Sequence, residues 1–180
     1  MARIDEVKKE ELTPRQKKLH DDISRTRGGR FGGPFPVWIR TPDIAEHADR
    51  LTNCFRANPK LDRRLIELIV LLVSRDATAK YAWSVHVPNG LKEGLTQETV
   101  DAIRARRRPD FKRDDERLIY DFVTELLATK TVSAASFERM KAAFGLDGVI
   151  EAVTCAGCYG MIGLVLNVFD IPPRPGYPLT

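Results

Sequence analysis

The hydrophobic and polar positions of this chain recur with the period of a helix, and convincing strand-like alternation is not found. Apolar residues return every three or four positions in the stretches 14–27, 42–54, 114–129 and 134–144, which predicts amphipathic helices there. The stretch LDRRLIELIVLLVS at 61–74 is apolar on nearly every side and predicts a central, buried helix. The pattern therefore predicts an all-α protein.

Caps and breakers set the expected ends of these helices. Thr13-Pro14 and Thr41-Pro42 each predict a capping residue followed by proline in the first helical turn. A break at 74–78 should start a new helix that Pro88 and Gly90 kink or end. The segment GGRFGGPFPVWIR at 28–40 contains four glycines and two prolines, so we expect a packed loop without regular structure. A short helix capped by Thr96 and a last helix over about 147–169 complete the set, with Gly145 closing the helix before it.

The chain is expected to form a single helical domain over 1–180, with an extended, proline-rich tail at 171–180. The tail is interpreted as an arm over a neighbouring subunit, anchored by Tyr177. Gly157, Gly160 and Gly163 remove side chains at helical spacing, which predicts a surface that another helix approaches closely, either in the core or at a subunit contact.

Composition and charge narrow the class of protein. The 180 residues are 43% hydrophobic and 30% charged, which is typical of a globular domain. The net charge is +4, but the basic cluster RARRRP at 104–109 ends a predicted helix, so it indicates a solvated helix end rather than a nucleic-acid site. The N-terminal sequence does not look like a signal peptide, charges and glycines interrupt the long apolar runs, and three cysteines indicate reduced thiols. We therefore expect a cytoplasmic protein without membrane or nucleic-acid partners.

Glu67 and His86 are the candidate chemical pair. They lie nineteen residues apart, so in one straight helix they would be separated by about 28 Å and rotated by about 100°. A break at 74–78, where serine, aspartate and threonine can bond the local backbone, would instead fold two antiparallel helices together. The carboxylate and the imidazole could then meet.

Ala79, Ala82, Trp83 and His86 share one face of the second helix, and the two alanines leave room for a cavity. A glutamate and a histidine in such a place could move protons near neutral pH. They could equally satisfy one another as a structural pair, which spacing alone favours. The three histidines fall on different predicted helices without metal-ligand spacing, so neither a metal nor another cofactor is expected.

The segment RRLIELIVLLVSRDATAKYAWSVHVPNGLKEGLT resembles the carboxymuconolactone decarboxylase family, which includes the alkylhydroperoxidase D-like (AhpD-like) proteins. The motif residues are Arg64, Glu67 and Leu68, then Tyr81, Trp83 and His86, then Gly94 and Thr96. The family's peroxidase branch has its two cysteines where this chain has Ala79 and Ala82, so disulfide-exchange chemistry at that place is excluded. The resemblance implies a compact, multi-helix AhpD-like fold that assembles as a trimer or hexamer.

The resemblance also implies a carboxy-lyase-like enzyme that decarboxylates, or transfers a proton to, a small carboxylated lactone or related aromatic-catabolism intermediate. Glu67, His86 and Tyr81 are the expected catalytic residues. The expected substrate contacts are Trp38, Arg40, Arg64, Ala82 and Trp83. Decarboxylases of the family commonly carry a glutamate where this chain has Ala82, which points to another substrate or to different proton-transfer chemistry.

Two alternatives remain open. Cys155 and Cys158 form a CxxC motif that could serve a thiol hydroperoxidase, but its apolar, mid-helix position favours packing cysteines. A pocket without chemistry would instead indicate a non-catalytic oligomer that binds a small ligand.

Overall fold

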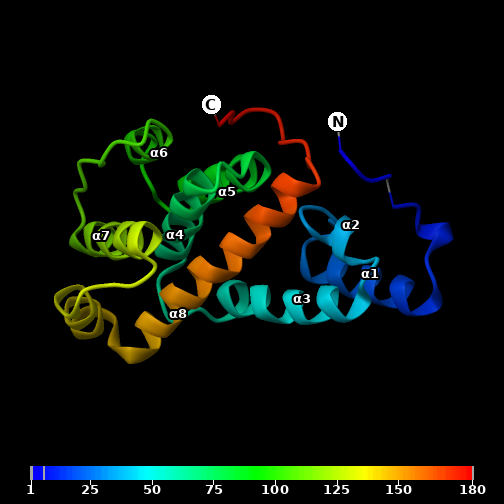
Figure 1. Cartoon of the computed structure of the whole chain (residues 1–180), viewed down its shortest axis with the longest axis horizontal. Coiled ribbons are helices and arrows are strands. Elements are labelled where there is room, and N and C mark those ends of the chain that lie inside the picture. The colour runs from blue at the N-terminus through cyan, green and yellow to red at the C-terminus, as the bar shows by residue number, and fades with distance from the viewer. Residues whose placement is uncertain (1, 6, 180) are drawn as a thin grey trace.

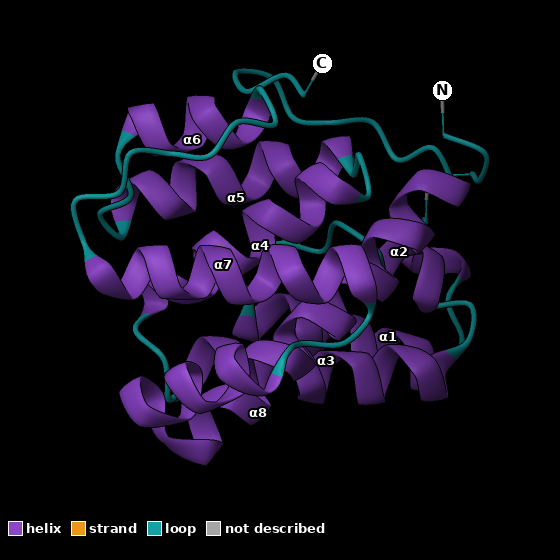
Figure 2. Ribbon diagram, turned by 60° about the vertical axis from the view of Figure 1, so that its left-hand side comes forward, coloured by secondary structure: helices purple, strands orange, loops and turns teal. Residues whose placement is uncertain are grey.

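The computed structural model describes residues 2–5 and 7–179, and every regular element in those residues is helical (Figure 1, Figure 2). The predicted all-α class is confirmed. After a short 3-10 helix at Lys9–Glu11, the elements in chain order are α1 (Pro14–Thr26), α2 (Phe35–Trp38), α3 (Pro42–Ala57), α4 (Arg63–Asp76), α5 (Lys80–Lys92), α6 (Gln97–Arg104), α7 (Asp114–Thr129) and α8 (Ala134–Val168).

Helix α4 lies at the centre of the fold, as its apolar sequence predicted. Leu68, Ile69, Val70 and Leu71 are completely buried, and α5, α7 and α8 all pack against α4 (Figure 1). Burying a side chain of this size stabilises the folded state by about 1.5–3 kcal/mol. The packing against α4 therefore fixes the positions of α5 and α8.

Capping side chains fix several helix starts. Thr13 and Gln16 form a reciprocal capping box before α1, and Thr96 and Ser133 cap α6 and α8. Thr41 does not cap α3 as predicted, because its hydroxyl donates a hydrogen bond back to the carbonyl of Trp38 at 3.1 Å. The start of α3 is thus tied to the preceding turn rather than to its own first amides.

One predicted loop is partly helical. The segment 28–40 is not wholly irregular, because its apolar residues form α2 and bury Phe35 and Trp38. Of the two outcomes predicted at Pro88 and Gly90, a kink or an end, the helix does not end there but continues to Lys92. A Cβ atom on Gly90 would lie only 2.8 Å from Leu95, so close packing of this last turn offsets the amide that proline lacks.

Helix α8 consists of two helices that meet at a kink. Gly145 has a φ of 69°, which favours glycine, and it separates the two segments as predicted. Contrary to the interrupted apolar runs expected from the sequence, α8 is long and apolar enough to cross a membrane by length and composition alone. Half of its most apolar window is buried inside the fold, as in the core helix of a folded domain.

The proline-rich tail packs on its own chain, and its contact with a neighbour stays a prediction. The amide of Arg174 donates a hydrogen bond to the Ser84 hydroxyl on α5 at 2.9 Å, and Leu179 is buried. Residues of the tail therefore cover one side of α5. Of the predicted tail at 171–180, residue 180 lies outside the described residues.

Candidate functional site

The turn between α4 and α5 brings Glu67 and His86 together, as the antiparallel arrangement predicted. The amide of Ala79 donates to the carbonyl of Ser74 at 2.8 Å, and Thr78 adopts a φ of 51°, which reverses the chain. The Nδ1 atom of His86 then lies 2.7 Å from Oε2 of Glu67. The two side chains form a direct hydrogen bond or, when the imidazole is protonated, an ion pair.

This pair is largely shielded from solvent. The side chains of His86 and Glu67 retain only 16% and 11% of their exposure. Tyr159 on α8 presents its ring edge-on to the imidazole, with the ring centroids 5.1 Å apart. Burial, followed by the nearby Cys155 thiol, raises the pKa of Tyr159 well above its ordinary value, so the phenol stays neutral beside the pair.

A cavity of about 430 Å³ opens beside His86. Its walls come from the segment after α1, from α3, α5 and α8, and from the tail, so elements far apart in sequence enclose it. Its lining combines aromatic rings with several guanidinium groups: Phe35, Tyr81, Tyr159 and Tyr177 with Arg27, Arg30, Arg56 and Arg174. Glu67 lies behind His86, outside the lining.

Tyr81 and Ala82 both line this cavity, as predicted. The Tyr81 hydroxyl accepts hydrogen bonds from the Gly33 amide at 2.9 Å and from Nη2 of Arg174 at 3.4 Å. Because both contacts use its lone pairs, the phenolic O–H is left to donate to a ligand. A Cβ atom on Gly32 would lie 2.9 Å from this hydroxyl, so the glycine allows the loop to close on Tyr81.

The structure does not place the two predicted tryptophans at the cavity. Trp83 is 1% exposed and packs in the core. Trp38 packs edge-on against Phe35, with centroids 5.5 Å apart, and so stands behind a residue that does line the cavity. Helical spacing grouped Trp83 with His86, but the indole ring of Trp83 is buried in the interior of the fold.

The two predicted arginine contacts also lie elsewhere. The guanidinium of Arg40 donates to the backbone carbonyls of Pro36 and Asp5 on the surface. Arg64 is buried and pairs with Glu116 and with Asp115, the latter at 2.7 Å. Its charge therefore holds α4 to α7. This structural role explains why the motif has an arginine here, and no ligand contact is needed to explain it.

Sequence reasoning missed Tyr159 and the four arginines that line the cavity. Arg27 directly follows α1 and Arg56 belongs to the last turn of α3, where a basic residue ordinarily indicates a solvated helix end. Arg174 belongs to the tail, and its Cζ lies 5.8 Å from the Tyr81 ring centroid. The excess of arginine near Tyr81 and His86 arises from tertiary packing, which helical spacing does not reveal.

The CxxC cysteines lie on the inner side of α8 and are free and buried. Burial is the main cause that raises the pKa of the Cys158 thiol, to about 11, and the pKa of Cys155 is also raised well above its ordinary value. Both thiols are therefore neutral near pH 7. Within the described residues, no group of three or more His, Cys, Asp or Glu side chains is arranged to hold a metal ion.

A family model matches the central part of the chain. A model of the carboxymuconolactone decarboxylase family matches residues 42–113, which span α3 to the start of α7 and include Glu67, Tyr81 and His86. The match covers 72 of the 180 residues. No curated protein matches the sequence.

Several solved structures share the fold. An alkylhydroperoxidase AhpD core protein from Ralstonia eutropha, described as an uncharacterized peroxidase-related protein, superposes with a TM-score of 0.80 at 15% identity, covering 97% of this chain and 93% of its own. A variant of the debrominase Bmp8 in complex with 2,3,4-tribromopyrrole gives 0.73 at 16% identity, with 94% and 90% covered. An AhpD-type protein of unknown function from Agrobacterium tumefaciens gives 0.69 at 17% identity, with 81% and 100% covered. At these identities the likeness establishes the fold.

Proposed function

We propose that the protein is a carboxymuconolactone decarboxylase-like lyase that decarboxylates, or transfers a proton to, a small carboxylated lactone or related intermediate of aromatic catabolism. The observation that carries this proposal is the Glu67–His86 hydrogen bond of 2.7 Å at the wall of an arginine-lined cavity. The pair supplies a proton-transfer group, and the guanidinium groups favour an anionic substrate.

In the proposed reaction, the carbon–carbon bond to a carboxylate breaks, carbon dioxide leaves, and the electron pair remains on carbon as an enolate. His86 then delivers a proton to that carbon and recovers one from solvent, so one proton is consumed for each carbon dioxide released. Glu67 holds Nδ1 of His86, which leaves the other ring nitrogen to exchange protons with the ligand. The Tyr81 hydroxyl can donate a hydrogen bond to the enolate oxygen.

Ala82 limits how closely the family's chemistry carries over. Decarboxylases of the family commonly have a glutamate at this position, and here the cavity wall carries only a methyl group. We therefore propose acid–base chemistry on a carboxylated substrate without assigning the particular lactone. The thiol hydroperoxidase alternative is disfavoured, because both buried thiols have raised pKa values and are poor nucleophiles near pH 7.

Carbon dioxide release from a panel of carboxylated lactones and β-keto acids tests this proposal. We expect turnover that falls about 100-fold in His86→Asn, because a positioned acid–base group contributes on that order to the rate. Glu67→Gln should lower the rate less and shift its pH profile, whereas a Cys155→Ser, Cys158→Ser double variant should keep it. Unchanged release in His86→Asn would contradict the assigned mechanism. Ligand binding without turnover of any panel member would favour the non-catalytic alternative.

A further inference from the structure

Arg56 has an unusual environment for a charged side chain. It lies in the last turn of α3 and lines the cavity. Its Nη2 donates to the backbone carbonyl of Thr26 at 3.0 Å. Its Nη1 is buried and has no hydrogen-bond partner among the described residues. A buried N–H of a charged group without an acceptor is costly and rare in native proteins, so the hydrogen-bonding capacity of Arg56 is not satisfied by the described residues.

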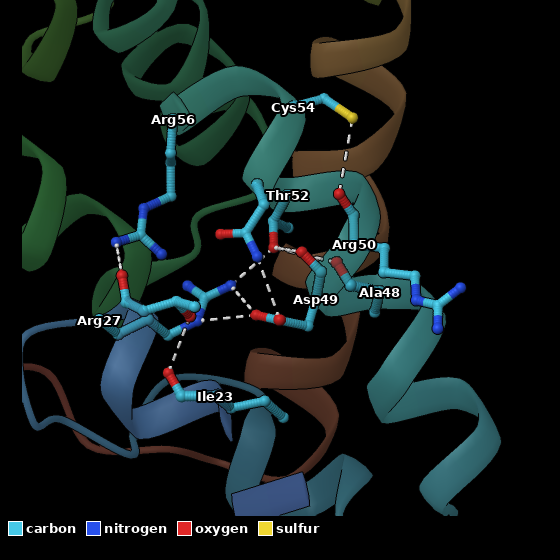
Figure 3. A network of polar contacts seen from close by, with 10 residues as sticks. Ile23, Arg27, Ala48, Asp49, Arg50, Thr52, Cys54 and Arg56 are labelled. Atoms are coloured by element: carbon cyan, nitrogen blue, oxygen red, sulfur yellow. Dashed lines mark hydrogen bonds and ion pairs between the residues drawn. The ribbon is translucent and has the colours of Figure 1, made fainter. Parts of the chain in front are cut away.

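The neighbouring Arg27 differs because its charge is already compensated. Its Nε and Nη2 donate to Asp49 at 3.1 and 2.8 Å, and Nη2 also donates to the Thr52 hydroxyl at 2.7 Å (Figure 3). No carboxylate of residues 2–5 or 7–179 forms an ion pair with Arg56. Burial first, and then the positive charge of Arg27, lowers the pKa of Arg56, yet a guanidinium remains charged at any physiological pH.

The cavity itself is suited to an anion. Of the described residues that line it, four are arginines and none is an aspartate or a glutamate. Arg56, Tyr159 and His86 all line it, and the Tyr159 ring lies edge-on to the His86 imidazole. A ligand held by its carboxylate at Arg56 would therefore share this cavity with His86.

We infer that Arg56, held beside Arg27 on the α3 side of the cavity, binds the carboxylate of a small organic acid. This deepens the proposed function and rests on it for one step only: the bound group would be a carboxylate that the substrate keeps, because Arg56 belongs to α3, whereas the Glu67–His86 pair belongs to α4 and α5. The binding itself does not require turnover.

Side-chain NMR on ¹⁵N-labelled protein tests this inference, with benzoate as the probe and benzamide as its neutral analogue. The Nε–Hε resonance of Arg56 is the one that is absent from the spectrum of Arg56→Gln. Benzoate should shift this resonance in the wild type, and benzamide should not. The dissociation constant of benzoate should rise about tenfold or more in Arg56→Gln, since a charge-assisted hydrogen bond is lost. Arg56→Lys keeps the charge but not the planar guanidinium, so its dissociation constant for benzoate should lie between those of the wild type and Arg56→Gln. It also lacks the Nε–Hε resonance, so it provides the assignment if the glutamine variant does not fold.

Arg50→Gln is the matched control. Arg50 lies on the same helix, pairs with Glu46 at 2.7 Å and extends on the side away from Arg27 and Arg56 (Figure 3). It should bind benzoate as the wild type does. His86→Asn should also keep the Arg56 shift, so a failure of the proposed catalysis would leave this result intact. Wild-type affinity in Arg56→Gln, equal binding of benzamide, tighter binding of inorganic phosphate than of benzoate, or no binding of benzoate would each overturn the inference.

Discussion

Cys155 and Cys158 differ from Cys54 in their surroundings, although all three are free thiols. Cys54 is exposed on α3, whereas the other two are buried in the packing of α8. Burial disfavours the thiolate, and it is the thiolate that reacts with alkylating agents and peroxides. The CxxC spacing is therefore a consequence of packing small side chains at helical intervals, and the reactivity of each thiol follows its burial.

This difference predicts the order of alkylation. With iodoacetamide at pH 8, Cys54 should react first. With a pKa of about 11, Cys158 should be only about one part in a thousand thiolate at that pH, and its rate should rise about tenfold per pH unit as the pH approaches the pKa. Mass spectrometry of quenched samples measures the three rates, and all three should become similar in concentrated urea. Alkylation of Cys155 or Cys158 as fast as Cys54 at pH 8 would instead support the thiol hydroperoxidase alternative.

The ion pair between α4 and α7 shows why a motif arginine need not contact a ligand. Arg64 and Glu116 are among the few charged side chains buried in the described core, and Arg64 also pairs with Asp115. Each charge is tolerated there because the other is present. This pair therefore fixes the position of α4, which in turn carries Glu67.

Removing one partner should destabilise the fold strongly. Among the described residues, Arg64→Met leaves buried Glu116 with Arg113, at 3.6 Å, as its remaining ion-pair partner, and we expect a loss of about 3–5 kcal/mol in the free energy of unfolding. The double variant Arg64→Met, Glu116→Leu should recover much of that loss, because no unpaired charge remains buried. Urea denaturation measures both. The control is Arg117→Gln, which breaks an exposed pair with Asp114 and should cost less than about 1 kcal/mol.

Equal stability of Arg64→Met and the control would show that Glu116 finds another partner or water. It would also return Arg64 to the candidates for ligand binding.

Helical periodicity and capping signals predicted most of the elements and one decisive contact. The apolar stretch of α4 and the break after Ser74 were sufficient to place Glu67 against His86, because two antiparallel helices leave few alternatives. At Pro88, where a kink or an end was predicted, the helix does not end, and the close packing of Gly90 against Leu95 supports the turn that follows.

The cavity could not be predicted in the same way. Arg27, Arg56 and Arg174 come from three elements that the sequence does not relate to one another, and the tail brings the last of them over α5. Trp83 illustrates the opposite error, since it shares a face with His86 by spacing but is buried in the core. Residue identity and spacing define which groups can meet along one helix, while the remaining wall of a site depends on how helices pack.

One face of α8 remains apolar on the outside of the molecule. Leu146, Ile150, Val153, Met161, Leu164 and Val168 are all between 40% and 65% exposed. They fall at intervals of three, four and, between Val153 and Met161, eight residues, which places them on a single stripe of the helix. Gly157 and Gly160 lie on the same stripe with open space around them, whereas Gly163 meets Ala77 and Ala79 in the interior, so the three glycines do not share one surface.

We propose that this stripe joins copies of the chain, in keeping with the trimer or hexamer that the family resemblance implies. Exposed apolar residues arranged in this way favour helix–helix contact, and the two glycines allow close approach. Leu164→Glu, at the most exposed apolar position, should dissociate the assembly, as measured by sedimentation velocity and light scattering, while circular dichroism stays unchanged. Lys141→Glu, on the other segment of α8, is the control and should keep the wild-type mass. A monomeric wild-type chain, or a Leu164→Glu variant of unchanged mass, would contradict this interface. Binding of the monomer to lipid vesicles, lost in Leu164→Glu, would instead assign the stripe to a membrane surface.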